Sequence, residues 1–444
     1  MDLLQGNVKK LYFKYLAAAF GSSLISTIYS LVDMIVVGQN QGPGGTAALA
    51  VVAPVWNIIY GLGLLFGIGG AVYFSTIRGK EEKQPENENE YFTAALIAGV
   101  VAALFCWVIF IFFDSQLLRL FGANEDLLPL AKKYLLPIKF VFPVYLFGQL
   151  FAAFLRNDGT PALATTAVLV GGVFNIFGDC FFVFVLNMGI MGAGLATAIG
   201  GTLSLVIMAT HFISRKNTLK VIPIQNIFSK LKLIVSAGFS TFFVDIAMGI
   251  VTVLLNNQIM KYANADALSV YGVIVNISTC VQACVYSIGQ ASQPLISINF
   301  GAEKWNRVKS ILRCALLTAA IFSFFWAGIT MLFPVHIVKL FMSATQEVIN
   351  IAPRIFRLYG LSFLLLPFNV FSTYYFQSLL QPKIAFAVSV CRGFVISSSM
   401  ILFMPVIWKD TGLWLAMPIT ELFVALIVIY YMKKCTSSLG SQEI

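Results

Sequence analysis

Four carboxylates and one guanidinium stand inside long apolar stretches of this sequence. The carboxylates are Asp33, Asp179, Asp245 and Glu421, and the guanidinium is Arg392. A charged side chain in the middle of a lipid bilayer costs about 2.5–3.5 kcal/mol on insertion scales. If these stretches cross a membrane, each charge therefore needs a partner or a function.

The first half of the chain carries a set of oxygen-bearing side chains that suits a small cation. Asn175 and Asp179 are four residues apart, which places them on one face of a helix. Thr197 lies in the next apolar segment, which returns across the membrane and reaches a similar depth, and Asp33 lies late in the first segment. Two carboxylates, an amide oxygen and a hydroxyl are hard ligands that suit Na⁺. Two carboxylates in a low dielectric can also share a proton, because their like charges repel. We predict a cation site here; alternatively, Asp33 braces a neighbouring helix and Asn175 and Asp179 form a structural hydrogen-bonded pair.

The second half has a different polar set. Asp245 and Glu421 predict a second carboxylate site for a cationic substrate or for protons. The alternative is that one of them pairs with Arg392, and the sequence leaves this open. Amide side chains within apolar stretches are expected to face the protein interior as part of a substrate or proton site, or else to bridge helices. They are Asn256, Asn276, Gln282, Gln290, Gln293, Asn369 and Gln377.

The elements that position these residues are predicted to be transmembrane helices. Of the 444 residues, 59% are hydrophobic and only 11% are charged, whereas soluble domains carry about 25% charged residues. A spanning helix needs about 20 apolar residues, and a membrane β-barrel would show alternating rather than continuous apolar runs. We therefore predict an all-α membrane protein of about twelve transmembrane helices. The apolar segments are 14–38, 46–77, 92–113, 133–156, 161–187, 190–214, 233–258, 266–298, 309–334, 352–380, 383–407 and 412–432.

The two halves of the chain resemble each other. Residues 67–79 match 289–301, 48–57 match 267–276, 154–161 match 375–382, and 192–196 match 412–416, in the same order and at a nearly constant offset. Six helices per copy give both copies the same orientation, so we expect two six-helix bundles related by a pseudo-two-fold axis along the membrane normal. The predicted domains are an N-terminal lobe (1–214), a cytoplasmic amphipathic linker lying on the inner leaflet (215–232) and a C-terminal lobe (233–444).

Basic residues set the predicted orientation. Lys and Arg are about twice as frequent in the loops on one side, which predicts that both termini are cytoplasmic. The net charge of +10 is explained by this bias, and no basic run has the aromatic interleaving of a nucleic-acid site. The sequence has no P-loop, no H-E-x-x-H motif and only two histidines. We therefore expect no enzyme activity, no ATP-driven transport and no bound cofactor.

Three motifs together resemble the multidrug and toxic compound extrusion (MATE) family, in its DinF- and MepA-like bacterial branch. They are Leu31-Val-Asp-Met-Ile-Val-Val-Gly38, Asn175-x-x-x-Asp179 and Gly192-Ala-Gly-Leu-Ala-Thr197. The resemblance implies that Asp33, Asn175, Asp179 and Thr197 bind a transported Na⁺ or H⁺ in the N-terminal lobe. One departure is that relatives often have a proline in the first helix, whereas residues 16–20 have none, so a bend there would rely on Gly21.

The activity that this resemblance implies is cation-coupled antiport. We expect an inner-membrane bacterial protein, monomeric and in contact with lipid, that exports amphipathic, often cationic, drugs and toxic compounds by alternating access. The alternative within the same superfamily is a flippase of lipid-linked substrates or a polysaccharide exporter.

Overall fold

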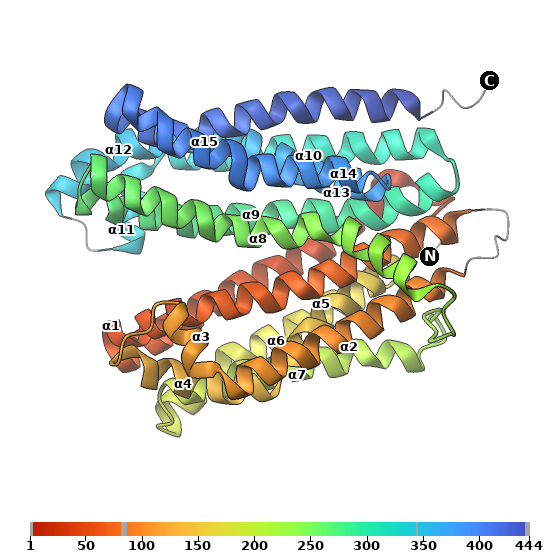
Figure 1. Cartoon of the computed structure of the whole chain (residues 1–444), viewed down its shortest axis with the longest axis horizontal. Coiled ribbons are helices and arrows are strands. Elements are labelled where there is room, and N and C mark those ends of the chain that lie inside the picture. The colour runs from red at the N-terminus through yellow and green to blue at the C-terminus, as the bar shows by residue number, and fades with distance from the viewer. Residues whose placement is uncertain (1–2, 81–86, 343–344, 440–444) are drawn as a thin grey trace. The chain divides into compact units, whose positions relative to one another are not determined.

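The computed structural model describes residues 3–80, 87–342 and 345–439, and nearly all of them are helical. Figure 1 shows that most of these residues form long helices. In chain order the first group is α1 (Val8–Gly79), α2 (Glu88–Phe112), α3 (Asp114–Leu120), α4 (Leu127–Phe140), α5 (Phe142–Asn157), α6 (Pro161–Cys180), the π-helical turn η1 (Phe181–Val185), α7 (Ile190–Ala209) and the 3₁₀ turn η2 (Thr210–Ile213). The second group is α8 (Ile227–Tyr262), α9 (Ala265–Gly301), α10 (Trp305–Leu332), α11 (Pro334–Phe341), α12 (Gln346–Gly360), α13 (Ser362–Ser378), α14 (Pro382–Val390), the π-helical turn η3 (Cys391–Val395) and α15 (Ile396–Ser438).

These helices supply the predicted membrane crossings. In the described residues, ten helical stretches are long and apolar enough to cross a membrane, and the pair α4 and α5, bent by 58°, makes an eleventh. One of the ten, Pro382–Ser438, is broken at Trp408 and Lys409, where the backbone is not helical. It therefore holds two crossings, which gives the predicted twelve. The first two crossings are likewise separated inside α1 at Gly42, whose φ of 64° suits glycine.

The chain divides into two compact units. Unit 1 contains Met1–Gln5 and Phe13–Gly238, and unit 2 contains Gly6–Tyr12 and Phe239–Ile444. Each unit has its own apolar core, from Val36 to Ala193 in unit 1 and from Val251 to Met417 in unit 2. The division between units falls within α8 rather than in the predicted linker. The first part of α8 belongs to unit 1 because Gly238 packs directly against the backbone of Leu65.

Residues 214–226, here called the connecting segment, form no regular helix and lead from η2 to α8. The sequence predicted an amphipathic linker over 215–232, but α8 already begins at Ile227. The connecting segment is extended because side chains of unit 1 accept its backbone N–H groups. The bonds are Thr218 N to Asp158 Oδ2 (3.0 Å), Lys220 N to Asn89 Oδ1 (2.8 Å), Ile222 N to Thr93 Oγ1 (3.1 Å) and Gln225 N to Glu90 Oε2 (3.1 Å).

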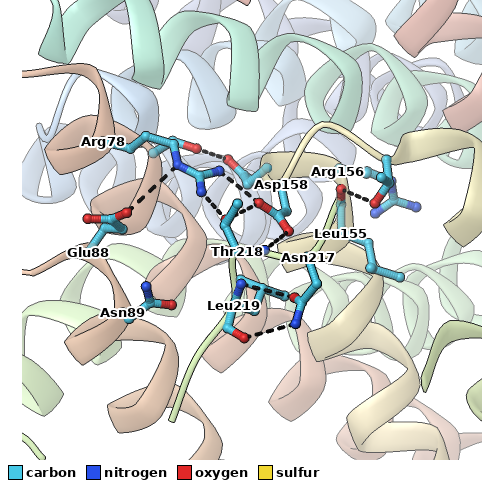
Figure 2. A network of polar contacts seen from close by, with 12 residues as sticks. Arg78, Glu88, Asn89, Leu155, Arg156, Asp158, Asn217, Thr218 and Leu219 are labelled. Atoms are coloured by element: carbon cyan, nitrogen blue, oxygen red, sulfur yellow. Dashed lines mark hydrogen bonds and ion pairs between the residues drawn. The ribbon is translucent and has the colours of Figure 1, made fainter. Parts of the chain in front are cut away.

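Asp158, in the short turn between α5 and α6, is the main anchor of the connecting segment. Figure 2 shows Arg78 and Asp158 converging on Thr218. Arg78 Nη1 lies 2.8 Å from Asp158 Oδ1, and His211 Nε2 lies 2.7 Å from Asp158 Oδ2. The Thr218 hydroxyl donates to the same carboxylate and accepts from Arg78. Burial alone would raise the pKa of Asp158, but the bonds from Thr218, His211 and Arg78 outweigh it and lower the pKa below its usual range.

Candidate cation site

Asp33 in α1 is buried, and only one of its two carboxylate oxygens has a hydrogen-bond partner in the described structure. Its side chain is 8% exposed. The hydroxyl of Tyr134, on α4, donates to Asp33 Oδ2 at 2.7 Å. The other oxygen, Oδ1, is buried and has no hydrogen-bond partner in the described structure. A carboxylate in this position retains one oxygen free for a cation or a proton.

Asn175 and Thr197 meet between α6 and α7. Asn175 Nδ2 donates to Thr197 Oγ1 at 3.1 Å, and the side chain of Tyr134 lies close to that of Thr197. Since Tyr134 donates to Asp33, the Asn175–Thr197 pair and the Tyr134–Asp33 pair are neighbours. Asn175 Oδ1, the oxygen on the opposite side of the amide, is buried without a donor.

Asp179 is the least satisfied member of the group. It is fully buried, at 0% exposure, and neither of its carboxylate oxygens has a partner in the described structure. It lies close enough to Asp33 for the two carboxylates to interact electrostatically. Together with Asp33 Oδ1 and Asn175 Oδ1, this makes four buried oxygen atoms without a donor. Such groups are rare in folded proteins, because a buried polar atom normally has a partner.

Glycines bring the helices that carry these residues into close contact. A Cβ on Gly171 of α6 would run into the carbonyl of Gly200 on α7, so the two backbones touch there. Gly178 lies less tightly against Ala196, and Gly194 lies against the carbonyl of Tyr134. The motif Gly192-Ala-Gly-Leu-Ala-Thr197 therefore has a structural role, because it lets α7 approach α4 and α6 closely enough for Thr197 to lie beside Tyr134 and Asn175. The π-helical turn η1 begins two residues after Asp179, and such turns are frequent at functional sites.

In unit 2, Glu421 pairs with Arg392, as one of the two sequence hypotheses proposed. Arg392 Nε lies 2.9 Å from Glu421 Oε1, and Asn369 Nδ2 donates to Glu421 Oε2 at 2.7 Å. Both oxygens of this fully buried carboxylate are thus occupied by protein donors. The side chain of Asp245 lies outside the described part of the structure.

The other predicted polar residues of unit 2 make separate local contacts. Gln377 Nε2 donates to Thr241 Oγ1 at 2.8 Å, and Gln282 Nε2 donates to Tyr286 Oη at 2.9 Å. Asn276 Nδ2 donates to the carbonyl of Gly272, one turn earlier in its own helix, at 2.9 Å. Asn256 and Gln290 are half-buried. These contacts do not include Glu421, so the structure does not join the unit 2 residues into one bonded cluster as it does those of unit 1.

Comparison with known proteins shows to which family the chain belongs. The sequence profile of the MatE family matches residues 18–181 and 237–401, one segment in each half and well over half of the chain. The chain belongs to the MatE family. Among relatives of this MATE protein, the "Multidrug export protein MepA" of Staphylococcus aureus is 23% identical over 421 residues, which cover 93% of this chain and 91% of the relative. The family consists of membrane transporters, so the protein is a transporter and not an enzyme.

Solved structures show the same fold. One is described as the outward-facing conformation of a multidrug resistance MATE family transporter of the MOP superfamily; its TM-score is 0.90 at 19% identity, with 98% of each chain covered. Another, from Pyrococcus furiosus, has a TM-score of 0.87 at 20% identity over 99% of this chain and 98% of that chain. Its description states that reverse polarity of its binding pocket suggests a different function. The MATE fold alone therefore does not define what is transported.

Sequence reasoning missed Tyr134, whose hydroxyl donates to Asp33 in this MATE protein. It also missed Tyr145, whose hydroxyl donates to the backbone carbonyl of Thr197. The signal for Tyr134 was the helical spacing of the buried residues of α4, Ala131, Tyr134, Leu135 and Ile138. That spacing shows that the ring points inward, but it does not show which side chain receives the hydroxyl.

Proposed function

We propose that this MATE transporter exports amphipathic, often cationic, compounds in exchange for Na⁺ or H⁺, and that the exchanged cation binds to Asp33, Asn175, Asp179 and Thr197. The observation that carries the proposal is the group of four buried oxygens without donors in unit 1. A Na⁺ ion would take such oxygens as ligands. Protons would convert the carboxylates into donors and neutralise them. The similarity to the multidrug export protein MepA supports drugs as the exported class.

Coupling requires that the cation binds the conformations of the transporter with different affinities. Two hydrogen-bonded pairs connect the helices of the site, Asn175 of α6 with Thr197 of α7 and Tyr134 of α4 with Asp33 of α1. A cation at Asp33 and Asp179 removes the repulsion between the two carboxylates and favours their closest approach. We propose that this cation-bound arrangement has low affinity for the exported compound, which couples the two fluxes reciprocally.

The proposal includes a place in the cell and an assembly state. The protein is a multi-pass protein of the bacterial inner membrane, a monomer, with both termini in the cytoplasm. The bias of basic residues toward the loops on one side supports this orientation. Labelling of single cysteines introduced at Ser437 and at Glu125 with an impermeant reagent on intact cells tests it, because only the second should react.

Transport into proteoliposomes tests the function. Purified protein is reconstituted, a Na⁺ or pH gradient is imposed, and movement of a fluorescent cationic dye is followed. We expect one of the two gradients to drive export in the wild type, and Asp33→Asn and Asp179→Asn to abolish that drive. Glu125→Gln, which breaks an exposed ion pair with Arg119, is the matched control and should behave as wild type. Gradient-driven export by Asp33→Asn at the wild-type rate would show that the site is assigned wrongly. Movement of a labelled lipid without export of any dye would favour the flippase alternative.

A further inference from the structure

Arg392 is a guanidinium inside a predicted membrane crossing, and only one side of it is paired. It belongs to the π-helical turn η3, and its Nε contacts Glu421 Oε1 at 2.9 Å. Glu421 is fully buried, and its second oxygen accepts from Asn369. The carboxylate is therefore saturated by the protein, and it fixes the inner edge of the guanidinium in place.

The outer edge of the guanidinium is open. Within the described residues, neither terminal nitrogen of Arg392 has an acceptor at hydrogen-bond distance, and the side chain is 13% exposed. Beside the pair, Asn369 Oδ1 is buried and has no donor. A guanidinium presents five N–H donors in a planar fork, of which the two terminal nitrogens hold four. Charged groups in membrane helices almost always face the bundle interior or a water-filled cavity, so these donors are positioned to meet a ligand there.

The equivalent positions in unit 1 show that the ion pair is not needed to pack this pair of helices. In the register that matches Pro161 with Pro382, Arg392 corresponds to Gly171. In the register that matches Gly192 with Gly412, Glu421 corresponds to Gly201. Both glycines of unit 1 are in such close contact with neighbours that no side chain would fit. The position of Arg392 is thus a glycine against α7 in unit 1, and the position of Glu421 is a glycine against Tyr145 of α5, whereas unit 2 has two buried charges at these positions. Buried ion pairs are costly to desolvate and are a poor source of stability, so the pair in unit 2 calls for a functional explanation.

We propose that the terminal nitrogens of Arg392 bind an oxyanion, namely the carboxylate, phosphate or sulfonate of an amphipathic molecule. Glu421 and Asn369 act as positioning residues that hold the guanidinium, and Asn369 Oδ1 accepts from a hydroxyl or amine next to the anionic group. The planar fork of arginine matches such oxyanions with two parallel bonds. The site would extend the range of exported compounds from cations to zwitterions. That consequence rests on the proposed function, whereas binding itself does not.

Binding of two matched dyes to purified protein tests the site. One dye is a cationic rhodamine ethyl ester, and the other is the corresponding free acid, which differs only in carrying a carboxylate. Fluorescence anisotropy measures both dissociation constants. In the double variant Arg392→Gln with Glu421→Gln, which leaves no unpaired buried charge, the acid should bind about tenfold more weakly. Binding of the ester should not change. An unchanged ratio of the two affinities in this variant would overturn the proposal.

Two single variants separate ligand binding from a structural role. Glu421→Gln removes the charge that opposes Arg392, so the acid should bind more tightly than to wild type. Arg392→Lys keeps the charge but loses the fork, so the acid should bind with intermediate affinity. A purely structural ion pair predicts instead that both variants weaken binding of both dyes equally. Asp33→Asn should leave the ratio of the two affinities unchanged, so failure of the cation site and failure of this site are distinguishable.

A lipid headgroup and a transported compound share this chemistry, and added lipid distinguishes them. If phosphatidylglycerol in the detergent micelles weakens binding of the acid to wild type but not to the double variant, the oxyanion site is supported and lipid phosphate occupies it. If it has no effect while the double variant still loses binding of the acid, the site is supported as one for transported compounds.

Discussion

Removal of the Asp158 carboxylate should loosen the connecting segment and destabilise unit 1. The side chain of Asp158 is fully buried, and it accepts from Arg78, His211 and both the backbone and the hydroxyl of Thr218. Asp158→Ala leaves the buried His211 without its acceptor and removes the closest carboxylate from Arg78, which keeps the Thr218 hydroxyl as an acceptor. Breaking a buried pair by removing one partner costs about 3–5 kcal/mol. Because the side chain of Arg78 is 22% exposed and water can reach it, we expect about 3 kcal/mol.

Thermal unfolding in detergent measures this loss. For a cooperative unit of 150–250 residues, 1 kcal/mol shifts Tm by about 2–4 °C, so Asp158→Ala should lower Tm by about 6–12 °C. The control is Glu125→Gln, whose side chain is 81% exposed in its pair with Arg119 and should not shift Tm measurably. Limited trypsinolysis gives a local readout, because Arg215, Lys216 and Lys220 lie in the connecting segment and should be cleaved faster in the variant.

The pKa of Asp158 also predicts how its contribution to stability changes with pH. The folded protein lowers the pKa of Asp158 below that of the unfolded chain. The ionised carboxylate therefore stabilises the fold at all pH values above the unfolded pKa of about 3.9. That contribution is lost as pH falls through the lower, folded pKa. The contribution of the Asp158 charge to the difference in Tm between wild type and Asp158→Ala should thus shrink only in acid below the unfolded pKa. Equal Tm values at neutral pH would refute the reasoning.

Two further predictions concern the packing and chemistry of the cation site. Gly171→Ala should push α6 away from α7, which should cost about 1–3 kcal/mol of stability and slow gradient-driven export. Thermal unfolding and dye transport measure these two effects. The control is Gly148→Ala, at a helical glycine with open space around it, which should leave stability and export unchanged. Thr197→Ala should weaken the response of dye export to the driving cation, because it removes the hydroxyl that accepts from Asn175. Thr197→Ser should retain that response, and equal transport curves for the two variants would contradict this role.

The helical membrane fold and the candidate cation-site residues of unit 1 could be predicted because their signals lie within short stretches of sequence. A carboxylate in an apolar run is conspicuous because lipid makes it costly, and the i,i+4 spacing of Asn175 and Asp179 defines a helix face without knowledge of the fold. Tyr134 was not predictable, since its hydrogen bond to Asp33 depends on how α4 packs against α1. The segment 215–232 was predicted as an amphipathic linker lying on the inner leaflet, from its interleaved basic and apolar residues. The extended form of the connecting segment depends on acceptors such as Asp158 and Asn89, which are distant in sequence and resemble ordinary loop residues.

The division of the chain into two units also sets the order in which contacts can form during synthesis. Every anchor of the connecting segment, from Arg78 to His211, precedes it in the sequence, so the ribosome has already made them when residues 214–226 emerge. The first turns of α1 are in the opposite situation. Gly6 and Tyr12 belong to unit 2, where the Gly6 carbonyl accepts from Arg307 at 2.8 Å and the Tyr12 hydroxyl donates to Thr318 at 3.0 Å. The amino terminus, which is translated first, therefore cannot reach its final bonded state until the chain has been made as far as Thr318, well into the second half.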